Sequence, residues 1–419
     1  MHLNYIFFNK LFSSLAILIP LSLITGGFIP DLFLSLIAIY FLIKCIHLNY
    51  WKLFTDKLIF LFLTFIIVIS FNSLFSSNPF ISFFTSIVYI RYLFFSLAIA
   101  HFVKYEKNFI KHLLISTALC LIIIVPDSYF QFITGKNILG WTSYSVDRLS
   151  SFFKDELIVG NYISKIFMLM TILLIHQNYS NNILKLLNIV LLLVVNFIVF
   201  ASGERAAFFH IFCFTIMLMI FSYNNFFYFK KVFIIFFLIC VSILTFSFDT
   251  SVKNRMIDHT INQINNKSIP FLPYSKHHEE HYLSAMKMFI DKPLIGQGSG
   301  LFRYLCLEEK FYNNKLTCST HPHNIYIQLL AENGIIGAIF LIIFYLFLTK
   351  IILTGVLQKY FFKSKDATNS RYLICTSALF MFFWPIIPTM DFFNQWENIL
   401  HFLTFGVFLF YLFDRKIDN

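Results

Sequence analysis

Apolar runs long enough to cross a lipid bilayer follow one another along almost the whole chain of 419 residues. A membrane-spanning helix needs about 20 mainly apolar residues. This criterion gives twelve candidate spans: residues 9–27, 31–46, 57–74, 82–103, 111–133, 157–177, 183–201, 205–222, 229–249, 324–349, 371–388 and 396–413. The first two could instead form a re-entrant pair, so the alternative is ten or eleven spans with one re-entrant segment. The sequence therefore predicts an all-α polytopic membrane protein with about twelve transmembrane helices.

The composition points to the same fold class. Hydrophobic residues make up 58% of the chain and charged residues only 13%. Soluble globular domains have roughly 45–50% and roughly 25%, respectively. The difference excludes a cytosolic enzyme, a disordered protein and a secreted disulfide scaffold. Although the net charge is +11, no basic run with interleaved stacking aromatics occurs in a soluble region, so we expect no nucleic-acid partner.

The positions of the basic residues set the expected orientation. Lys and Arg concentrate in the cytoplasmic loops of membrane proteins. Basic clusters, for example at residues 104–111, follow every second span, which places both termini in the cytoplasm. We therefore expect nine spans with short loops in residues 1–249, a large periplasmic loop at 250–323, and three spans with a short cytoplasmic tail in 324–419.

The large loop contains an amphipathic stretch followed by a glycine-rich one. Leu283, Met286 and Phe289 recur at helical spacing, which predicts a helix over residues 279–290. The glycine-rich segment at 296–300 follows it. Such segments can cradle phosphate, but here no strand precedes the glycines and no Lys-Ser/Thr follows them. A tight turn is therefore the favoured interpretation, with phosphate binding as the alternative.

Cys306 and Cys318 lie in the large loop, whereas the other five of the seven cysteines lie in or beside apolar spans. Cysteines in apolar surroundings are usually packing residues. In an oxidising periplasm the two loop cysteines could form a disulfide just before the next motif. We favour this bridge over two free thiols.

The string His321-Pro322-His323-Asn324 stands where the large loop re-enters the membrane. Histidine is the side chain best suited to act as a general base near neutral pH. Asn324 can cap the helix that begins there, and its amide could also orient a substrate hydroxyl. A His-x-His pair can bind a metal, but no third ligand follows at helical spacing, so we expect no metal site. His321 and His323 are both candidate bases, with a merely solvated pair as the alternative.

Arg205 lies in the short connection Ser202-Gly203-Glu204-Arg205 between two apolar spans. We expect Ser202 to cap the helix that follows. A helix N-terminus has unpaired N–H groups and a partial positive charge, and an added arginine makes it an anion site. Snorkelling at the interface is the alternative. Because basic residues are otherwise scarce on the expected outer side, we favour a functional role.

Other cations are further candidates. Arg148 lies in a polar outer loop and could line a site for a charged substrate or belong to a self-neutralising surface loop. Arg255 and Arg303 lie in the large loop, where arginine is common. Arg91 and Lys165 lie within apolar spans, where a charge is costly and suggests a site by default.

Together these features resemble the O-antigen ligase and O-antigen polymerase superfamily of bacterial envelopes. The resemblance rests on the twelve-span plan with a large outer loop late in the chain. It also rests on His321-Pro322-His323-Asn324 followed by Gly334-Ile335-Ile336-Gly337. Shorter strings add to it: residues 293–302, residues 202–205, Arg148 with residues 153–156, and Pro388 with residues 392–394.

The resemblance implies a membrane glycosyltransferase of GT-C-like architecture in the bacterial inner membrane, with its active site facing the periplasm. Such enzymes move a glycan from an undecaprenyl-diphosphate carrier to an acceptor hydroxyl with inversion, without a metal, a nucleotide sugar or another cofactor. The acceptor is lipid A–core for a ligase and the growing glycan for a polymerase. The compact outer motifs favour the ligase type. Membrane lipids surround the bundle, which would hold the polyprenyl chain.

The resemblance also implies roles for individual residues. His323 or His321 would deprotonate the acceptor hydroxyl, and spacing does not choose between them. Asn324 would contact the diphosphate or the acceptor. Arginines would neutralise the leaving diphosphate: Arg205, Arg148, Arg303 and Arg255. Stabilising developing charge in this way is often the largest catalytic term.

A transporter of lipid-linked glycans is the alternative from another class, with Arg91, Lys165 and Arg205 lining a polar path. Transporters more often show internal repeats and helix breaks in corresponding halves, and neither is clear in this sequence. A non-catalytic assembly partner is a third hypothesis, and such a protein would still work after the substitution His323→Ala.

Overall fold

The regular elements of the protein are helices. The structure is a computed structural model, and it describes residues 2–145, 147–177, 182–221, 251–265, 275–361 and 367–417, among which no strand occurs. The elements are α1 His2–Ser22, η1 Leu23–Thr25, α2 Phe28–His47, η2 Tyr50–Thr55, α3 Lys57–Ser73, α4 Pro79–Val88, α5 Ile90–Tyr105, α6 Phe109–Thr134, η3 Ser151–Phe153, α7 Val159–His176, α8 Asn182–Ala201, α9 Arg205–Phe221, α11 Ser251–Lys253, η4 Asn254–Asp258, α12 His259–Asn265, α13 Lys276–Asp291, α14 Phe302–Leu305, α15 Ile325–Tyr360, α16 Ala367–Phe382 and α17 Gln395–Ile417.

Seven helices in the described part of the chain are long and apolar enough to cross a membrane. They are Ile6–Thr25, Phe28–His47, Pro79–Tyr105, Phe109–Thr134, Val159–His176, Ile325–Tyr360 and Gln395–Arg415. Shorter apolar helices accompany them: Lys57–Ser73, Val190–Ala201, Arg205–Phe221 and Ser370–Phe382. All of these coincide with predicted spans, and the remaining predicted span, 229–249, lies outside the described residues. The all-helical class with several candidate spans is confirmed.

The helix α5 is mostly buried and packs against α2 and α17. It can do so closely because Gly406 of α17 has no side chain: a Cβ there would collide with Ile99 of α5. The hydroxyl of Ser96 also donates to the carbonyl of Phe402 over 2.9 Å. Small residues allow this close approach of helices inside a membrane.

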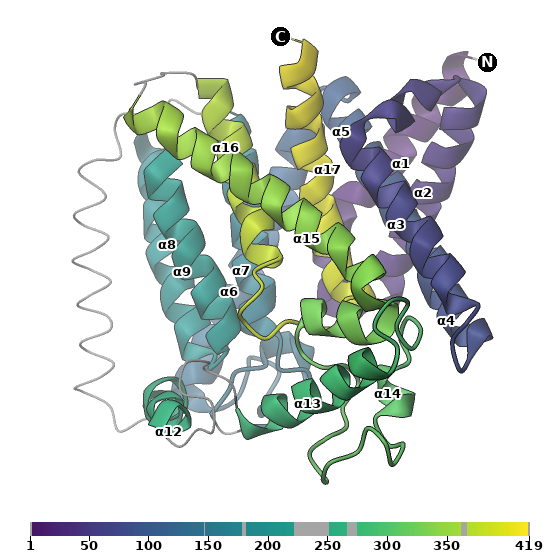
Figure 1. Cartoon of the computed structure of the whole chain (residues 1–419). Coiled ribbons are helices and arrows are strands. Elements are labelled where there is room, and N and C mark those ends of the chain that lie inside the picture. Colours follow the sequence, from purple (N-terminus) through teal and green to yellow (C-terminus); the bar gives the residue numbers. More distant parts are fainter. Residues whose placement is uncertain are drawn as a thin grey trace.

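Both termini lie at one end of the bundle, and α12, α13 and α14 lie at the other end (Figure 1). This arrangement agrees with the prediction that the two termini share one side and that the large loop faces the opposite side.

The two cations predicted within apolar spans, Arg91 and Lys165, are each paired with an acid. Arg91 of α5 forms an ion pair of 2.8 Å with Asp31 of α2. Lys165 of α7 forms an ion pair with Glu397 of α17. Pairing is the usual way in which a folded chain holds charges within apolar surroundings. Arg91 therefore has a structural partner. This pairing argues against the alternative in which Arg91 is a free cation that lines a polar path.

The glycine-rich segment docks against a break in α15. Gly334 interrupts that helix with a φ of 64° and a ψ of −170°. At the break, Ile335 N donates to Pro293 O over 2.9 Å, and Gly298 N donates to Glu332 O over 2.7 Å. The buried carboxylate of Glu332 accepts from Gly300 N over 3.0 Å.

These bonds decide between the two interpretations of the glycine-rich segment. Gly296, Gly298 and Gly300 all have positive φ angles of 72°, 117° and 73°, which glycine adopts without steric penalty. The N–H groups of Gln297, Gly298 and Gly300 donate to α15 rather than pointing to an open cradle. The segment is a tight turn that fixes the first part of α15.

We expect Gly334→Ala to destabilise the protein. A Cβ at this position would collide with the carbonyl oxygen of Leu294, and the backbone conformation there is open essentially only to glycine, with strain of about 1–3 kcal/mol for other residues. Thermal unfolding in detergent should show a lower Tm. Gly27→Ala is the matched control, because a Cβ at Gly27 would meet nothing within 4 Å. Equal Tm values for the two variants would contradict this account.

The structure shortens one predicted span. The sequence predicts a helix over 371–388, but α16 ends at Phe382. Pro385 and Pro388 follow, and proline cannot donate the N–H that continues a helix. The non-helical residues 383–394 form part of the wall of the cavity described next.

Candidate functional site

A cavity of about 480 Å³ brings together residues that are far apart in the sequence. Its walls come from the starts of α7 and α9, from the segment of η4 and α12, from α13, and from the connection between α16 and α17. Four of the predicted site residues line it: Arg148, Arg205, Arg255 and His323. We call it the arginine cavity.

The three arginines are held by different partners. Arg255 donates to Gly203 O over 2.9 Å and forms an ion pair of 2.9 Å with Asp147. Arg205 donates from Nη1 to the side chains of Thr260 at 3.1 Å and Gln263 at 2.7 Å. These contacts fix the arginines while leaving further donor groups on each guanidinium.

Arg148 is anchored through the carbonyl oxygen of Leu157, to which its Nη2 donates. Its Nε is buried and has no hydrogen-bond partner within the described part of the chain. Among those residues, no carboxylate forms an ion pair with Arg148 or Arg205. Both guanidinium groups therefore keep their charge available for an anion.

The acidic residues that line the cavity are each engaged elsewhere. Glu204 accepts from Gly160 N over 2.7 Å and thus holds the first turn of α7. Glu397 pairs with Lys165. Asp391 pairs with Arg303 at 3.0 Å and accepts from Gln328 at 2.7 Å. Glu204 and Asp147 interact electrostatically with Arg148 without forming an ion pair with it, and no carboxylate in the described residues forms an ion pair with Arg205.

The connection before α9 differs from the predicted one. The hydroxyl of Ser202 donates to Val199 O over 2.7 Å and accepts from Glu204 N over 3.4 Å, so it bonds to the residue before α9, which begins only at Arg205. Gly203 has a φ of 74°, and a Cβ there would collide with Asp147 and crowd Arg148. The glycine thus allows the loop that carries Arg148 to approach the start of α9.

The two histidines of the loop motif differ in their ring contacts. His321 is bonded at both nitrogens, with Nε2 3.3 Å from Thr389 O and Nδ1 2.9 Å from Thr320 Oγ1. A carbonyl oxygen only accepts, so Nε2 of His321 must donate to Thr389 O. Nδ1 of His321 then carries the lone pair, which accepts from the hydroxyl of Thr320. His323 has one ring contact, Nε2 at 3.1 Å from Ser319 Oγ. Only His323 lines the arginine cavity.

His323 also has an unusual backbone conformation. Its φ is +62°, which is uncommon for residues other than glycine. Such strain persists where the surroundings hold a residue in place, and it is concentrated at functional sites. Thr389 provides much of that hold. Its N–H donates to His323 O over 2.9 Å, and its hydroxyl accepts from Ile325 N over 3.0 Å.

Two further histidines surround the motif. His278 and His281 project from α13, and each ring centroid lies 5.3 Å from that of His323, whereas the rings of His321 and His323 lie 4.1 Å apart. We call these four residues the histidine cluster. Only His278 and His323 among them line the arginine cavity. No group of three or more possible ligands in the described residues has metal-binding geometry.

The histidines of this cluster have lowered pKa values. Burial, followed by the neighbouring histidines His321, His278 and His281, lowers the pKa of His323. Burial lowers the pKa of His278 to about 4, and it also lowers the pKa of His281. Burial lowers the pKa of His321 as well, against the opposing charge of Asp391. At neutral pH the rings are therefore uncharged, which is the form that can accept a proton.

These shifts predict a loss of stability in acid. In the unfolded chain histidines titrate near 6.5, whereas His278 in the fold stays neutral down to about 4. Between these values the unfolded state binds more protons, so the free energy of unfolding falls as the pH falls. We expect Tm to decrease between pH 7 and pH 5, and to decrease less in His278→Asn. A wild-type and a variant curve with the same slope would contradict this assignment.

Arg303 and Asn324 do not line the cavity. Arg303 reaches the site only through its ion pair with Asp391, and its side chain is 42% exposed. The side-chain oxygen of Asn324 caps α15 by accepting from Tyr326 N at 3.0 Å and Ile327 N at 3.2 Å. Its Nδ2 donates to Pro385 O over 2.7 Å. The structure thus gives Asn324 the predicted capping contact through Oδ1, while one N–H of its Nδ2 bonds to the connection before α17.

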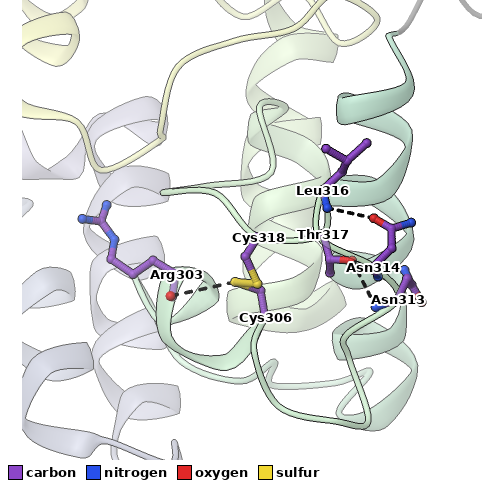
Figure 2. The surroundings of a disulfide bond; sticks show 7 residues. All are labelled: Arg303, Cys306, Asn313, Asn314, Leu316, Thr317 and Cys318. Carbon is purple, nitrogen blue, oxygen red and sulfur yellow. Dashed lines mark hydrogen bonds between the residues drawn. A yellow bond between two sulfur atoms is a disulfide. The ribbon is translucent and has the colours of Figure 1, made fainter.

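A disulfide joins Cys306 and Cys318 just before the histidine motif (Figure 2). It closes a loop whose turn is held by Thr317, whose hydroxyl accepts from Asn313 N and Asn314 N (Figure 2). Cys45, Cys120, Cys213 and Cys375 are free, and Cys240 lies outside the described residues. The bridge limits the freedom of the chain leading to His321.

Some residues of the site were not predicted from the sequence. Asp391 lies directly before Phe392 in the connection between α16 and α17, and an acid at this place, paired with Arg303, was an available signal. His278 belongs to the string His277-His278-Glu279-Glu280-His281, which marks a polar start of the amphipathic helix. Thr389 and Glu204 act through backbone contacts, for which the sequence carries no signal.

Comparison with known proteins gives one finding. Residues 187–342 match a family model described as O-Antigen ligase. The matched region includes Arg205, Arg255 and His323 of the arginine cavity, and Arg148 precedes it. A search of curated proteins found no match. The predicted relationship to O-antigen ligases is confirmed.

Proposed function

We propose that this protein is a membrane glycosyltransferase. The premise is that residues 187–342 belong to an O-antigen ligase-related family. The protein moves a glycan from an undecaprenyl-diphosphate carrier to a hydroxyl of lipid A–core, as an O-antigen ligase does. The observation that carries this proposal is the meeting of Arg148, Arg205, Arg255 and His323 at one cavity.

The diphosphate is the group that the arginines suit. Arg148 and Arg205 have charges that no carboxylate pairs with in the described residues, and Arg255 adds a third guanidinium. Arginine binds phosphate oxygens through parallel N–H donors. As the sugar–phosphate bond breaks, negative charge grows on the diphosphate, and fixed cations stabilise this charge more than that of the bound donor.

His323 is the proposed base. In the reactive tautomer, Nε2–H donates to Ser319 Oγ, and Nδ1 accepts the proton of the acceptor hydroxyl. The oxygen forms a bond to the anomeric carbon, and the bond from that carbon to the diphosphate breaks on the opposite face. The diphosphate leaves with the electron pair, and the anomeric configuration is inverted. His321 supports the loop instead, because both of its ring nitrogens are bonded to protein.

The pKa of His323 supports this role when the donor is bound. Burial lowers that pKa in the free protein, which keeps the ring neutral but makes it a weak base. A bound diphosphate places negative charge in the same cavity and raises the pKa towards neutrality. Base strength therefore increases only when the donor is present.

An apolar cavity lies next to the arginine cavity, where the polyprenyl chain of the donor would begin. A small cavity of about 70 Å³ is lined almost wholly by aromatic and aliphatic side chains of α3, α15 and α17. It shares Phe383, Phe392 and His401 with the arginine cavity. A lipid with a polar head and an apolar tail would find both environments side by side.

The side of the membrane is part of the proposal. We assign the arginine cavity and the large loop, residues 250–323, to the periplasm of a bacterial inner membrane. The disulfide between Cys306 and Cys318 supports this, since disulfides persist in oxidising compartments. The location of the termini at the opposite end of the bundle agrees with it (Figure 1).

Reconstitution tests the proposed function. The purified protein in liposomes is given an undecaprenyl-diphosphate glycan, with lipid A–core and carrier-linked glycan offered as separate acceptors. Transfer to lipid A–core that is lost in His323→Ala is the expected result. Chain lengthening on the carrier would instead establish a polymerase. Movement of the glycan across the bilayer without transfer to either acceptor would favour a transporter and overturn the proposal.

A further inference from the structure

A second hollow, of about 770 Å³, adjoins the arginine cavity and has no part in the proposed function so far. Its walls come from the turn between α1 and α2, from the polar loop that follows α6, and from the turn before α17. Ile158 and Met390 line both spaces. The two hollows therefore share a wall.

The lining of this second hollow combines aromatic faces with polar groups. Trp141 and Phe152 are partly exposed, and Lys154 and Glu156 add an ammonium and a carboxylate. Asn394 adds amide N–H groups, since its Oδ1 already accepts from Glu397 N over 3.0 Å. The ammonium of Lys154 lies 4.8 Å from the centre of the Trp141 ring. Aromatic rings pack against the C–H faces of pyranose sugars, and carboxylates and amides bond to sugar hydroxyls. Mainly apolar walls with a few fixed polar groups are typical of ligand sites.

Buried polar side chains hold the loop that forms this lining. The oxygen of Gln131 accepts from the N–H groups of Ser150 at 2.9 Å and Ser151 at 2.8 Å. Asn137 donates to Ser151 O over 3.0 Å and accepts from Trp141 N over 2.8 Å. Gln131 and Asn137 are only 2% and 1% exposed. The buried side chains of Gln131 and Asn137 thus fix the positions of Trp141 and its neighbours.

The loop is also held in a strained conformation. Ser151 and Lys154 have φ angles of 49° and 54°, although neither is glycine. Strain of this kind persists only where the surroundings impose it. A surface loop fixed in this way is ordered before a ligand arrives, which reduces the entropy lost on binding.

The shared wall lies next to the proposed base. Thr389 donates to His323 O over 2.9 Å, and Met390, the next residue, lines both hollows. A transfer reaction needs two substrates whose reacting atoms meet. The donor diphosphate takes the arginine cavity, so the neighbouring hollow is placed for the partner that brings the hydroxyl.

We propose that this second hollow binds the saccharide of the acceptor, with a pyranose ring against Trp141 and hydroxyls bonded by Glu156 and Asn394. Naming the saccharide as that of the acceptor rests on the proposed function. Binding of a saccharide in this hollow does not itself require transfer. The acyl chains of a lipid and the glycan of the donor are the other occupants that the experiments distinguish.

The first experiment measures binding without donor. The full chain in nanodiscs is titrated with delipidated core oligosaccharide, and binding is followed by saturation-transfer NMR. We expect binding by the wild type, and binding weakened about five- to tenfold in Trp141→Ala and in Glu156→Gln. Tyr144→Ala is the control, because Tyr144 lies in the same loop, is 82% exposed and does not line the hollow. Binding only of the lipid-bearing molecule, or equal binding by all four proteins, would overturn the proposal.

The second experiment measures transfer. In the same variants we expect KM for the acceptor to rise about five- to tenfold, with kcat and the KM for the donor little changed. A rise confined to the KM of the donor would assign the hollow to the donor glycan and refute the proposal. If the wild type binds the oligosaccharide through Trp141 but transfers nothing, the proposed function fails while this site stands.

Discussion

Replacing His323 by Ala lowers the rate of glycan transfer by about 10²–10⁴-fold, the range typical for loss of a general acid or base. His323 lines the arginine cavity, and its single ring contact, to Ser319, leaves the other nitrogen for the acceptor hydroxyl. His321 stands only two residues earlier, but its ring is bonded on both sides to Thr320 and Thr389. His321→Ala should therefore retain much more of the transfer rate than His323→Ala.

Single-turnover transfer by the purified protein measures this difference directly, because it does not depend on product release. Free imidazole should restore part of the rate of His323→Ala, and it should not help His321→Ala. The Tm of each variant shows whether the fold is intact. Equal losses in the two variants, without rescue of either, would contradict the assignment of the base.

Replacing Arg205 by Ala lowers the rate of transfer by about 10²–10³-fold, as for the removal of one fixed group that stabilises a transition-state charge. Arg205 is held by Thr260 and Gln263, which are neutral, so its charge is not shared with a carboxylate. Arg205→Lys should recover only a small part of this loss, since an ammonium cannot offer two parallel N–H donors.

Arg303→Ala is the matched control for this experiment. Arg303 is an arginine of the large loop that, unlike Arg205, lies outside the cavity and pairs with Asp391. We expect its transfer rate to remain close to that of the wild type. Steady-state kinetics with varied donor measures both variants, and similar losses of kcat in Arg205→Ala and Arg303→Ala would mean that the cavity does not select the arginines that act.

Much of the fold could be predicted from the sequence because the signals are local. Apolar length alone located the spans, and amphipathic spacing located α13 (Lys276–Asp291). The Asn324 cap and the glycine turn before α15 follow from short-range hydrogen bonding and positive φ angles. Where local rules compete, prediction failed: Pro385 ended α16 early, and Glu204 rather than Ser202 lies directly before α9.

The candidate site could be predicted only in parts. The residue types were visible as His323, Arg205 and Arg148, but whether they meet depends on packing between helices that lie far apart in the chain. Arg303 forms an ion pair with Asp391, which lies 88 residues away in the sequence. Arg303 therefore does not join the other three predicted arginines in the cavity. The choice between His321 and His323 depended on Thr389, which reaches the motif from the connection before α17.

The central claim is that the arginine cavity receives the diphosphate of a lipid-linked glycan. The most direct test is the affinity of the purified protein for undecaprenyl diphosphate, which lacks the glycan. We compare the wild type, the double variant Arg205→Ala with Arg148→Ala, and Arg303→Ala. The account predicts binding that weakens with added salt, is lost in the double variant and is unchanged in Arg303→Ala. Equal affinity in all three proteins would contradict it.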